Sequence, residues 1–115
     1  MSRESGMAAE RLAANYLLAV GMKILQTNYT CKGGELDIIC DDGGTLVFVE
    51  VRSRASNKFG TPIETIGVTK RRRIVHAATH YLAAHRSMER PCRFDVVSIE
   101  NGEITHVRDA FGTTY

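Results

Sequence analysis

The strongest constraint on the fold is a pair of short β-rich runs joined by a segment that ends in two glycines. One run covers Glu35–Cys40, the other covers Thr45–Arg52, and Asp41-Asp42-Gly43-Gly44 lies between them. Branched and aromatic side chains favour strands, and a Gly-Gly pair between such runs favours a two-residue hairpin turn. If the two glycines form that turn, residues that face each other across the hairpin have numbers that sum to 87. We therefore predict an antiparallel hairpin with a defined register.

This register brings acidic side chains together. It places Asp37 directly across from Glu50, and Glu35 across from Arg52. Like charges that oppose each other destabilise a strand pair, and apolar neighbours on the same face reduce their hydration. A bound cation removes this cost, and Mg²⁺ prefers a few carboxylate oxygens together with waters and a substrate phosphate. The hairpin therefore predicts a Mg²⁺ or Mn²⁺ site at Asp37 and Glu50.

The remaining sequence places the hairpin inside a mixed α/β chain. Apolar residues at helical spacing predict two helices, and Gly21 is expected at the end of the first. The residues at helical spacing in the first helix are Ala9, Leu12, Ala13, Tyr16, Leu17 and Val20, and the predicted buried stripe of the second helix is Ile74, Ala78, Tyr81 and Leu82. The predicted elements are helices at 5–21 and from 64 or 69 to 86, a loop at 57–62, and strands at 24–31, 35–40, 45–52, 93–99 and 103–107. The order αβββαββ predicts a central mixed sheet flanked by helices.

A cation held by Asp37 and Glu50 would suit phosphodiester hydrolysis, because it could polarise the scissile phosphate and stabilise the developing charge. We predict that Asp37, Glu50 and Arg52 are the catalytic residues, since Arg52 shares a strand face with Glu50. Glu10 is a candidate outer metal ligand if the first helix packs across the hairpin, although a helical glutamate is more often a surface residue. Asp95 could share this face, or be bound by Arg93 or a turn amide, and is left outside the catalytic set.

Length and composition limit the class of protein. The chain has 115 residues, 43% of them hydrophobic, which is enough for one core, and we predict a single domain over residues 1–115. Charged residues interrupt every stretch of membrane-spanning length, and no secretory leader is recognisable, so we predict a cytoplasmic protein without a membrane partner. The three cysteines lack C-x-x-C spacing and are expected to be reduced thiols.

Charge is distributed unevenly along the chain. The formal net charge is +2, but residues 52–73 carry seven basic side chains and one acidic one, while the segments before and after are net acidic. A basic cluster attracts polyanions if the fold gathers it on one face. The predicted nucleic-acid-binding residues are Arg54, Lys58, Lys70, Arg71 and Arg73.

Two alternatives stay open for these charged residues. The basic block could be a solvated helix start. Asp37 and Glu50 could each be neutralised by Arg52, Arg54 or Lys70, in an ion-pair network that only fixes the fold.

The ordered motifs resemble those of the YraN family of predicted endonucleases over nearly the whole chain. This resemblance implies a restriction-endonuclease-like core related to archaeal-type Holliday junction resolvases, with a D-x(n)-E-x-K metal site at Asp37, Glu50 and position 52. It also implies DNA as the partner, including branched or flap forms, and is compatible with a homodimer. The motifs are Gly6-x-x-Ala9-Glu10, Gly34-Glu35-Leu36-Asp37-Ile38-Ile39, Val47-Phe48-Val49-Glu50-Val51-Arg52, Phe59-Gly60-x-Pro62, Lys70-Arg71-Arg72-Arg73 and Arg93-Phe94-Asp95-Val96-Val97.

The chain departs from the motif at position 52, where arginine replaces the lysine. A lysine can lose its proton when desolvated, whereas an arginine stays charged and presents a broad planar fork. Arg52 could orient a phosphate but could not serve as a general base. The alternative function is therefore a nucleic-acid-binding or partner-recruiting module that has kept the fold and lost turnover.

Overall fold

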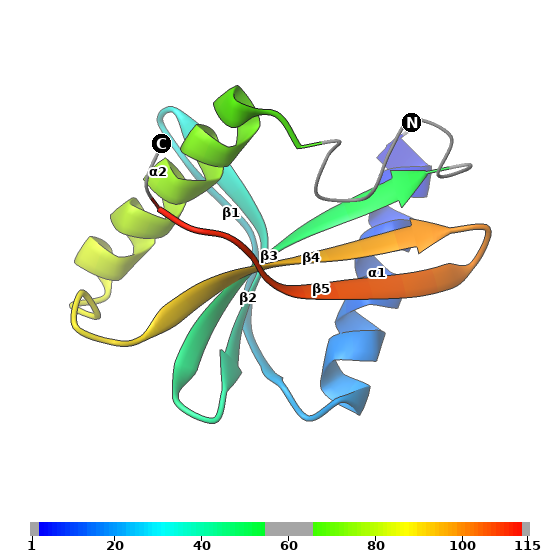
Figure 1. The fold of residues 1–115 in the computed structure, drawn as a ribbon, viewed down its shortest axis with the longest axis horizontal. Helices are drawn as coiled ribbons and strands as arrows, with labels where there is room; N and C mark the ends of the chain where they lie inside the picture. The colour runs from blue at the N-terminus through cyan, green and yellow to red at the C-terminus, as the bar shows by residue number, and fades with distance from the viewer. Residues whose placement is uncertain (1–2, 55–65, 114–115) are drawn as a thin grey trace.

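The computed structural model describes residues 3–54 and 66–113, and within them the order αβββαββ is confirmed (Figure 1). The helices end close to their predicted limits, and Gly21, just beyond the first, has a φ of 96° that favours glycine. The last strand continues beyond the predicted residue 107. The predicted loop at 57–62 lies outside the described residues. The elements are α1 (Arg3–Ala19), β1 (Lys23–Cys31), β2 (Gly34–Asp42), β3 (Thr45–Arg54), α2 (Val68–Ala84), β4 (Cys92–Glu100) and β5 (Glu103–Phe111).

The strands form one mixed sheet in the order β1-β2-β3-β4-β5. The pairs β1–β2, β2–β3 and β4–β5 are antiparallel, whereas β3 and β4 are parallel. Parallel neighbours need a crossover connection, and α2 lies in the sequence between these two strands. The fold is therefore α/β with a central mixed sheet, as predicted, and it is consistent with the restriction-endonuclease-like core.

The two helices pack on opposite faces of the sheet. Ala9, Ala13 and Leu17 of α1 are buried against Ile38, Val47 and other residues of one face. The predicted stripe of α2 is buried against the other face, together with Ala77. Among the apolar residues at helical spacing in α1, Leu12 and Val20 are not buried, with exposed fractions of 47% and 42%. Residues four apart lie on one line of a helix, so the line from Ala9 to Leu17 faces the sheet, while Leu12 points aside and Val20 follows the helix end.

The β2–β3 hairpin has the predicted register. Its pairs run from Asp42–Thr45 to Ile38–Val49, and each pair sums to 87. Gly43 and Gly44 both have positive φ, at 61° and 104°, as a tight hairpin turn requires. The paired ladder ends at Ile38–Val49, one position before Asp37 and Glu50.

Helix α2 lies unusually close to the start of β2. A Cβ added at Gly34 would overlap the carbonyl oxygen of Arg73 and lie 3.1 Å from the Cβ of Ala77. Gly34 does not have a positive φ, so glycine is required here by space and not by backbone conformation. This contact fixes the first turns of α2 relative to the hairpin.

None of the described helices is both long and apolar enough to cross a membrane. The thiols of Cys31, Cys40 and Cys92 form no disulfide in the described part of the chain.

Candidate metal-binding carboxylate site

Asp37 and Glu50 meet where β2 and β3 stop pairing. Beyond the Ile38–Val49 pair, the Asp37 side chain joins the two strands. Its Oδ2 accepts a hydrogen bond from the backbone N–H of Val51 at 2.8 Å. The Asp37 and Glu50 side chains also lie close enough for each to shift the pKa of the other. The predicted convergence of these two side chains therefore follows from the register and from the local separation of the strands.

Burial perturbs both carboxyls of this pair. Glu50 is only 5% exposed, and its burial, together with the charge of Asp37, raises its pKa to about 8. Burial also raises the pKa of Asp37, although the Val51 N–H, Lys70 and the contact with Glu50 oppose the rise. Two carboxyls that share one site cannot both ionise easily, so near neutral pH the pair retains a proton.

Lys70 of α2 lies next to this carboxyl pair. The Nζ of Lys70, in the first turn of α2, lies 3.5 Å from Oε1 of Glu50 and 3.9 Å from Oε1 of Glu35. Lys70 was predicted to bind nucleic acid or, in the ion-pair alternative, to neutralise one of the carboxyls. Its contact with Glu50 is the one that the ion-pair alternative predicts. Arg52, half-buried on β3, also lowers the pKa of Glu50, to a smaller extent than Lys70 does.

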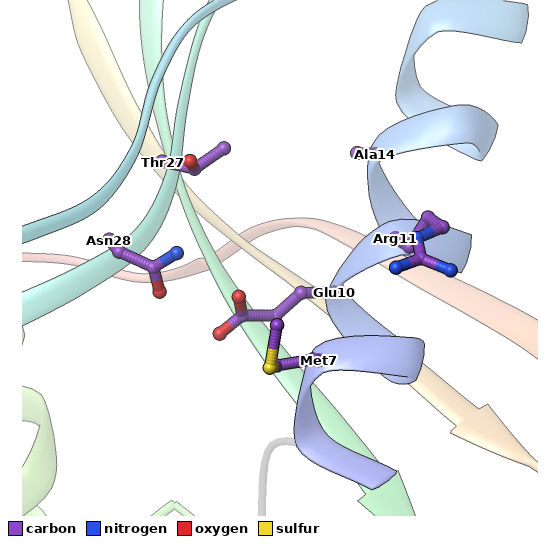
Figure 2. A pocket seen from close by; sticks show the side chains of 6 residues that line it. All are labelled: Met7, Glu10, Arg11, Ala14, Thr27 and Asn28. Atoms are coloured by element: carbon purple, nitrogen blue, oxygen red, sulfur yellow. The ribbon is translucent and has the colours of Figure 1, made fainter. Parts of the chain in front are cut away.

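Glu10 approaches the pair from α1. Burial and the charge of Asp37 raise the pKa of Glu10. The amide of Asn28, oriented by its hydrogen-bond partners, donates to the two Glu10 oxygens at 3.3 and 3.2 Å. Asn28 has a φ of 52°, which asparagine tolerates, and stands in β1 at the position opposite Asp37. Figure 2 shows the Glu10 carboxylate directed toward Asn28. These two residues line a cavity of about 210 Å³ together with Met7, Arg11, Ala14 and Thr27.

The donor set of this site fits a hard divalent ion. Two carboxyls in contact supply oxygen ligands, and Mg²⁺ or Mn²⁺ takes the rest of its shell from water and phosphate. Among the side chains that the structure describes, no three of His, Cys, Asp or Glu gather closely enough to hold a metal together. Asp37 and Glu50 are thus the central pair, and the role of Glu10 as an outer ligand stays a prediction.

The predicted nucleic-acid-binding residues divide into separate environments. Lys70 faces the carboxyls, whereas the guanidinium of Arg71 lies over the Phe111 ring, 5.7 Å from its centre. Arg73 is exposed on α2. The side chain of Arg54 and all of Lys58 lie outside the part of the chain that the structure describes.

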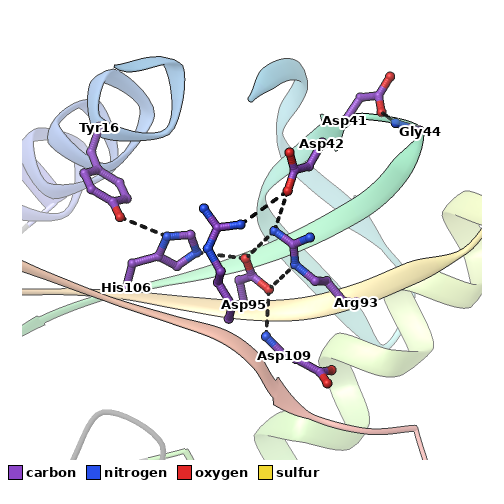
Figure 3. A network of polar contacts seen from close by, with 9 residues as sticks. Tyr16, Asp41, Asp42, Gly44, Arg93, Asp95, His106 and Asp109 are labelled. Carbon is purple, nitrogen blue, oxygen red and sulfur yellow. Dashed lines mark hydrogen bonds and ion pairs between the residues drawn. The ribbon is translucent and has the colours of Figure 1, made fainter. Parts of the chain in front are cut away.

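Asp95 belongs to a second polar network, in which the predicted partner Arg93 is present and His106 is a partner that the sequence did not predict (Figure 3). It is fully buried, and its carboxylate accepts from Arg93 at 3.0 Å, from the backbone N–H of Asp109 at 3.0 Å, and pairs with Nε2 of His106 at 2.8 Å. Burial alone would raise the pKa of Asp95, but these bonds outweigh it and hold the pKa below its usual value. The hydroxyl of Tyr16 bonds Nδ1 of His106 at 3.0 Å, so the network ties β4 and β5 to α1.

The only sequence signal for this network was Arg93, two residues before Asp95 on the same strand face. The partnership with His106 depends on the β4–β5 register, which shifts between Phe94 and Val96 and could not be read from the turn alone. Asp95 alternates with Val96, whose partner in β3 is Glu50, so it faces the other side of the sheet from the carboxyl pair.

Comparison with known proteins finds one family across most of the chain. The model of "Uncharacterised protein family UPF0102" matches residues 9–99. A UPF0102 protein of Symbiobacterium thermophilum is 47% identical over 89% of this chain and 86% of its own length. A UPF0102 protein of Legionella pneumophila is 42% identical over 96% of this chain and 97% of its own length. A relative from a Janthinobacterium species is 44% identical over 92% of this chain and 85% of its own.

Proposed function

The chain belongs to the UPF0102 (YraN) family, whose names assign no activity, and from the geometry of its site we propose that it is a divalent-metal-dependent endonuclease that hydrolyses DNA phosphodiester bonds. The observation that carries this proposal is the buried contact between Asp37 and Glu50, with Lys70 beside it. Two buried carboxyls with raised pKa values destabilise the fold when both are charged, so a purely structural role does not explain them. A bound cation would compensate their charge.

Each residue of the site has a role in this proposal. Asp37 and Glu50 would hold the ion, and the Val51 N–H keeps the Asp37 carboxylate in place for it. When bound, such an ion supplies a Lewis acid that polarises the scissile phosphate. Arg52, on the same strand face as Glu50, would orient a phosphate oxygen through its planar fork, since it stays charged. Glu10 would act from the α1 side as an outer ligand.

The proposed substrate is DNA recognised by shape and phosphate. The first turns of α2 carry four consecutive basic residues, and its first turn holds no acidic residue, so this end of the helix is strongly positive. By resemblance, branched or flap DNA is the preferred form and a homodimer the assembly. We propose that the protein acts in the cytoplasm, where its free thiols remain reduced.

A second function is favoured by one specific residue. Arg52 stands where the resembled motif has lysine, and an arginine cannot act as a general base. In this alternative the chain binds nucleic acid or recruits a partner at the same surface and has no turnover.

Cleavage assays separate the two functions. We would incubate linear duplex, single-stranded and four-way DNA with Mg²⁺ or Mn²⁺, and compare the wild type with Asp37→Ala, Glu50→Ala and Arg52→Lys. The nuclease proposal predicts that each alanine variant loses cleavage by about 100-fold or more. Cleavage that survives both alanine changes would contradict it and indicate a contaminant. Metal-dependent binding without cleavage, with activity gained by Arg52→Lys, would favour the binding module.

A further inference from the structure

Lys70 lies at the boundary between the buried carboxyl pair and solvent. The side chains of Glu50, Lys70 and Glu35 are 6%, 34% and 55% exposed, and the ammonium of Lys70 lies between the two glutamates. An anion that approaches Glu50 from the exposed Glu35 side therefore meets the charge of Lys70 first.

The stability of α2 does not explain this position. Lys70 occupies the first helical turn, where a positive side chain opposes the helix dipole. The first turn contains no acidic residue to compensate, and the N-cap residue Gly67 makes no side-chain capping bond. The partners of Lys70 on β2 and β3 account for its placement better than its own helix does.

The packing of α2 holds Lys70 at this point. The backbone of Arg73, three residues after Lys70, rests directly on Gly34 with no side chain between them. Glu35, one of the two partners of Lys70, is the next residue after Gly34. The contact that brings helix and strand together thus also sets the distance between the ammonium and the carboxyls.

We propose that Lys70 is the residue that contacts a phosphate oxygen of the nucleic-acid strand held by a cation at Asp37 and Glu50. The inference rests on the proposed function and adds to it the residue that recognises the phosphate next to the ion. A lysine ammonium is compact and has three donors, so it can serve Glu50, Glu35 and a phosphate oxygen together.

The test measures binding, so that it does not depend on turnover. A fluorescein-labelled four-way DNA is titrated with protein in Ca²⁺ and in EDTA, and the gain in affinity with Ca²⁺ is compared among variants. Uptake of Mn²⁺ alone is measured by calorimetry. Lys70→Met keeps the aliphatic stem and removes the charge, Lys70→Arg keeps the charge, and Lys23→Met is the matched control at an exposed lysine at the start of β1.

We expect the wild type to bind DNA about tenfold or more tightly in Ca²⁺, since charge-assisted contacts to phosphate have this magnitude. Lys70→Met should lose most of this gain while its Mn²⁺ affinity stays within about threefold of wild type. Lys70→Arg should recover part of the gain, and Lys23→Met should keep all of it. If Lys70→Met does not fold, Lys70→Gln replaces it, because an amide can still donate to Glu50.

Three results would overturn the assignment. A Lys70→Met variant that keeps the full Ca²⁺ gain leaves the proposed metal site intact and removes Lys70 from phosphate recognition. A variant that loses Mn²⁺ uptake together with the gain shows that Lys70 only maintains the carboxyl pair. A wild-type protein that takes up no Mn²⁺ contradicts the proposed function itself, and the Lys70 assignment with it.

Discussion

The close contact between β2 and α2 predicts a large effect from a small substitution, Gly34→Ala. The added methyl group would overlap the carbonyl oxygen of Arg73 and press on Ala77, so the helix has to move away by about 1 Å to restore van der Waals contact. Overpacking of this kind costs about 1–3 kcal/mol. The same movement would carry Lys70 away from Glu50, a pair now 3.5 Å apart.

Urea unfolding followed by circular dichroism measures the loss of stability. The matched control is Gly112→Ala, because Gly112 has no positive φ and no atom lies within 4 Å of an added Cβ. We expect the control to stay within about 0.5 kcal/mol of wild type, as a surface substitution does. A Gly34→Ala protein as stable as the wild type, with unchanged metal-dependent DNA binding, would refute the packing argument and the link from packing to the site.

Three further predictions concern the two polar networks. In metal-free buffer Glu50→Gln should stabilise the protein. The pKa of Glu50 is about 8 in the folded protein, above its value in the unfolded chain, so the wild type loses stability as pH rises from about 4.5 toward 8. The loss is at most about 1.4 kcal/mol per pH unit. Thermal melts across this range would show the variant gaining on the wild type with pH, and equal curves would argue against the burial of this charge. Millimolar Mg²⁺ should raise the melting temperature of the wild type and not that of Glu50→Gln. Asp95→Asn should lower stability by about 1–3 kcal/mol. The pKa of Asp95 is lower in the folded protein than in the unfolded chain, so in the wild type its charge stabilises the fold above the unfolded pKa, and this contribution is lost as pH falls through the folded pKa. The variant should therefore lose less stability than the wild type at acid pH.

Local patterns were sufficient to predict most of the fold. The two glycines of the β2–β3 turn fixed a register that the structure reproduces, because the side-chain period of a strand leaves no freedom once the turn is known. Helix positions followed from apolar spacing, but the orientation of α1 did not. The sequence cannot show which line of a wide apolar stripe will face a twisted sheet, and Leu12 and Val20 of this stripe are exposed.

The site was predictable where it is local and not where it depends on packing. Asp37 and Glu50 come from one hairpin, so their meeting could be inferred from numbering alone. The approach of Lys70 depends on how closely α2 packs on Gly34, which is a tertiary property without a sequence signal beyond the glycine itself. The Asp95–His106 pair depends on a register shift in the second hairpin, and no turn rule predicts such a shift.

The central claim is that the Asp37–Glu50 pair binds a divalent cation, and titration calorimetry with Mn²⁺ tests it most directly. The account predicts uptake of Mn²⁺ by the wild type in the presence of DNA, no uptake by the Asp37→Asn/Glu50→Gln double variant, and unchanged uptake by Glu103→Gln, a control at an exposed glutamate of β5. Asparagine at position 37 can still accept from the Val51 N–H, so the double variant should keep its fold. A folded wild-type protein that binds no Mn²⁺ at millimolar concentrations, with or without DNA, would contradict the account.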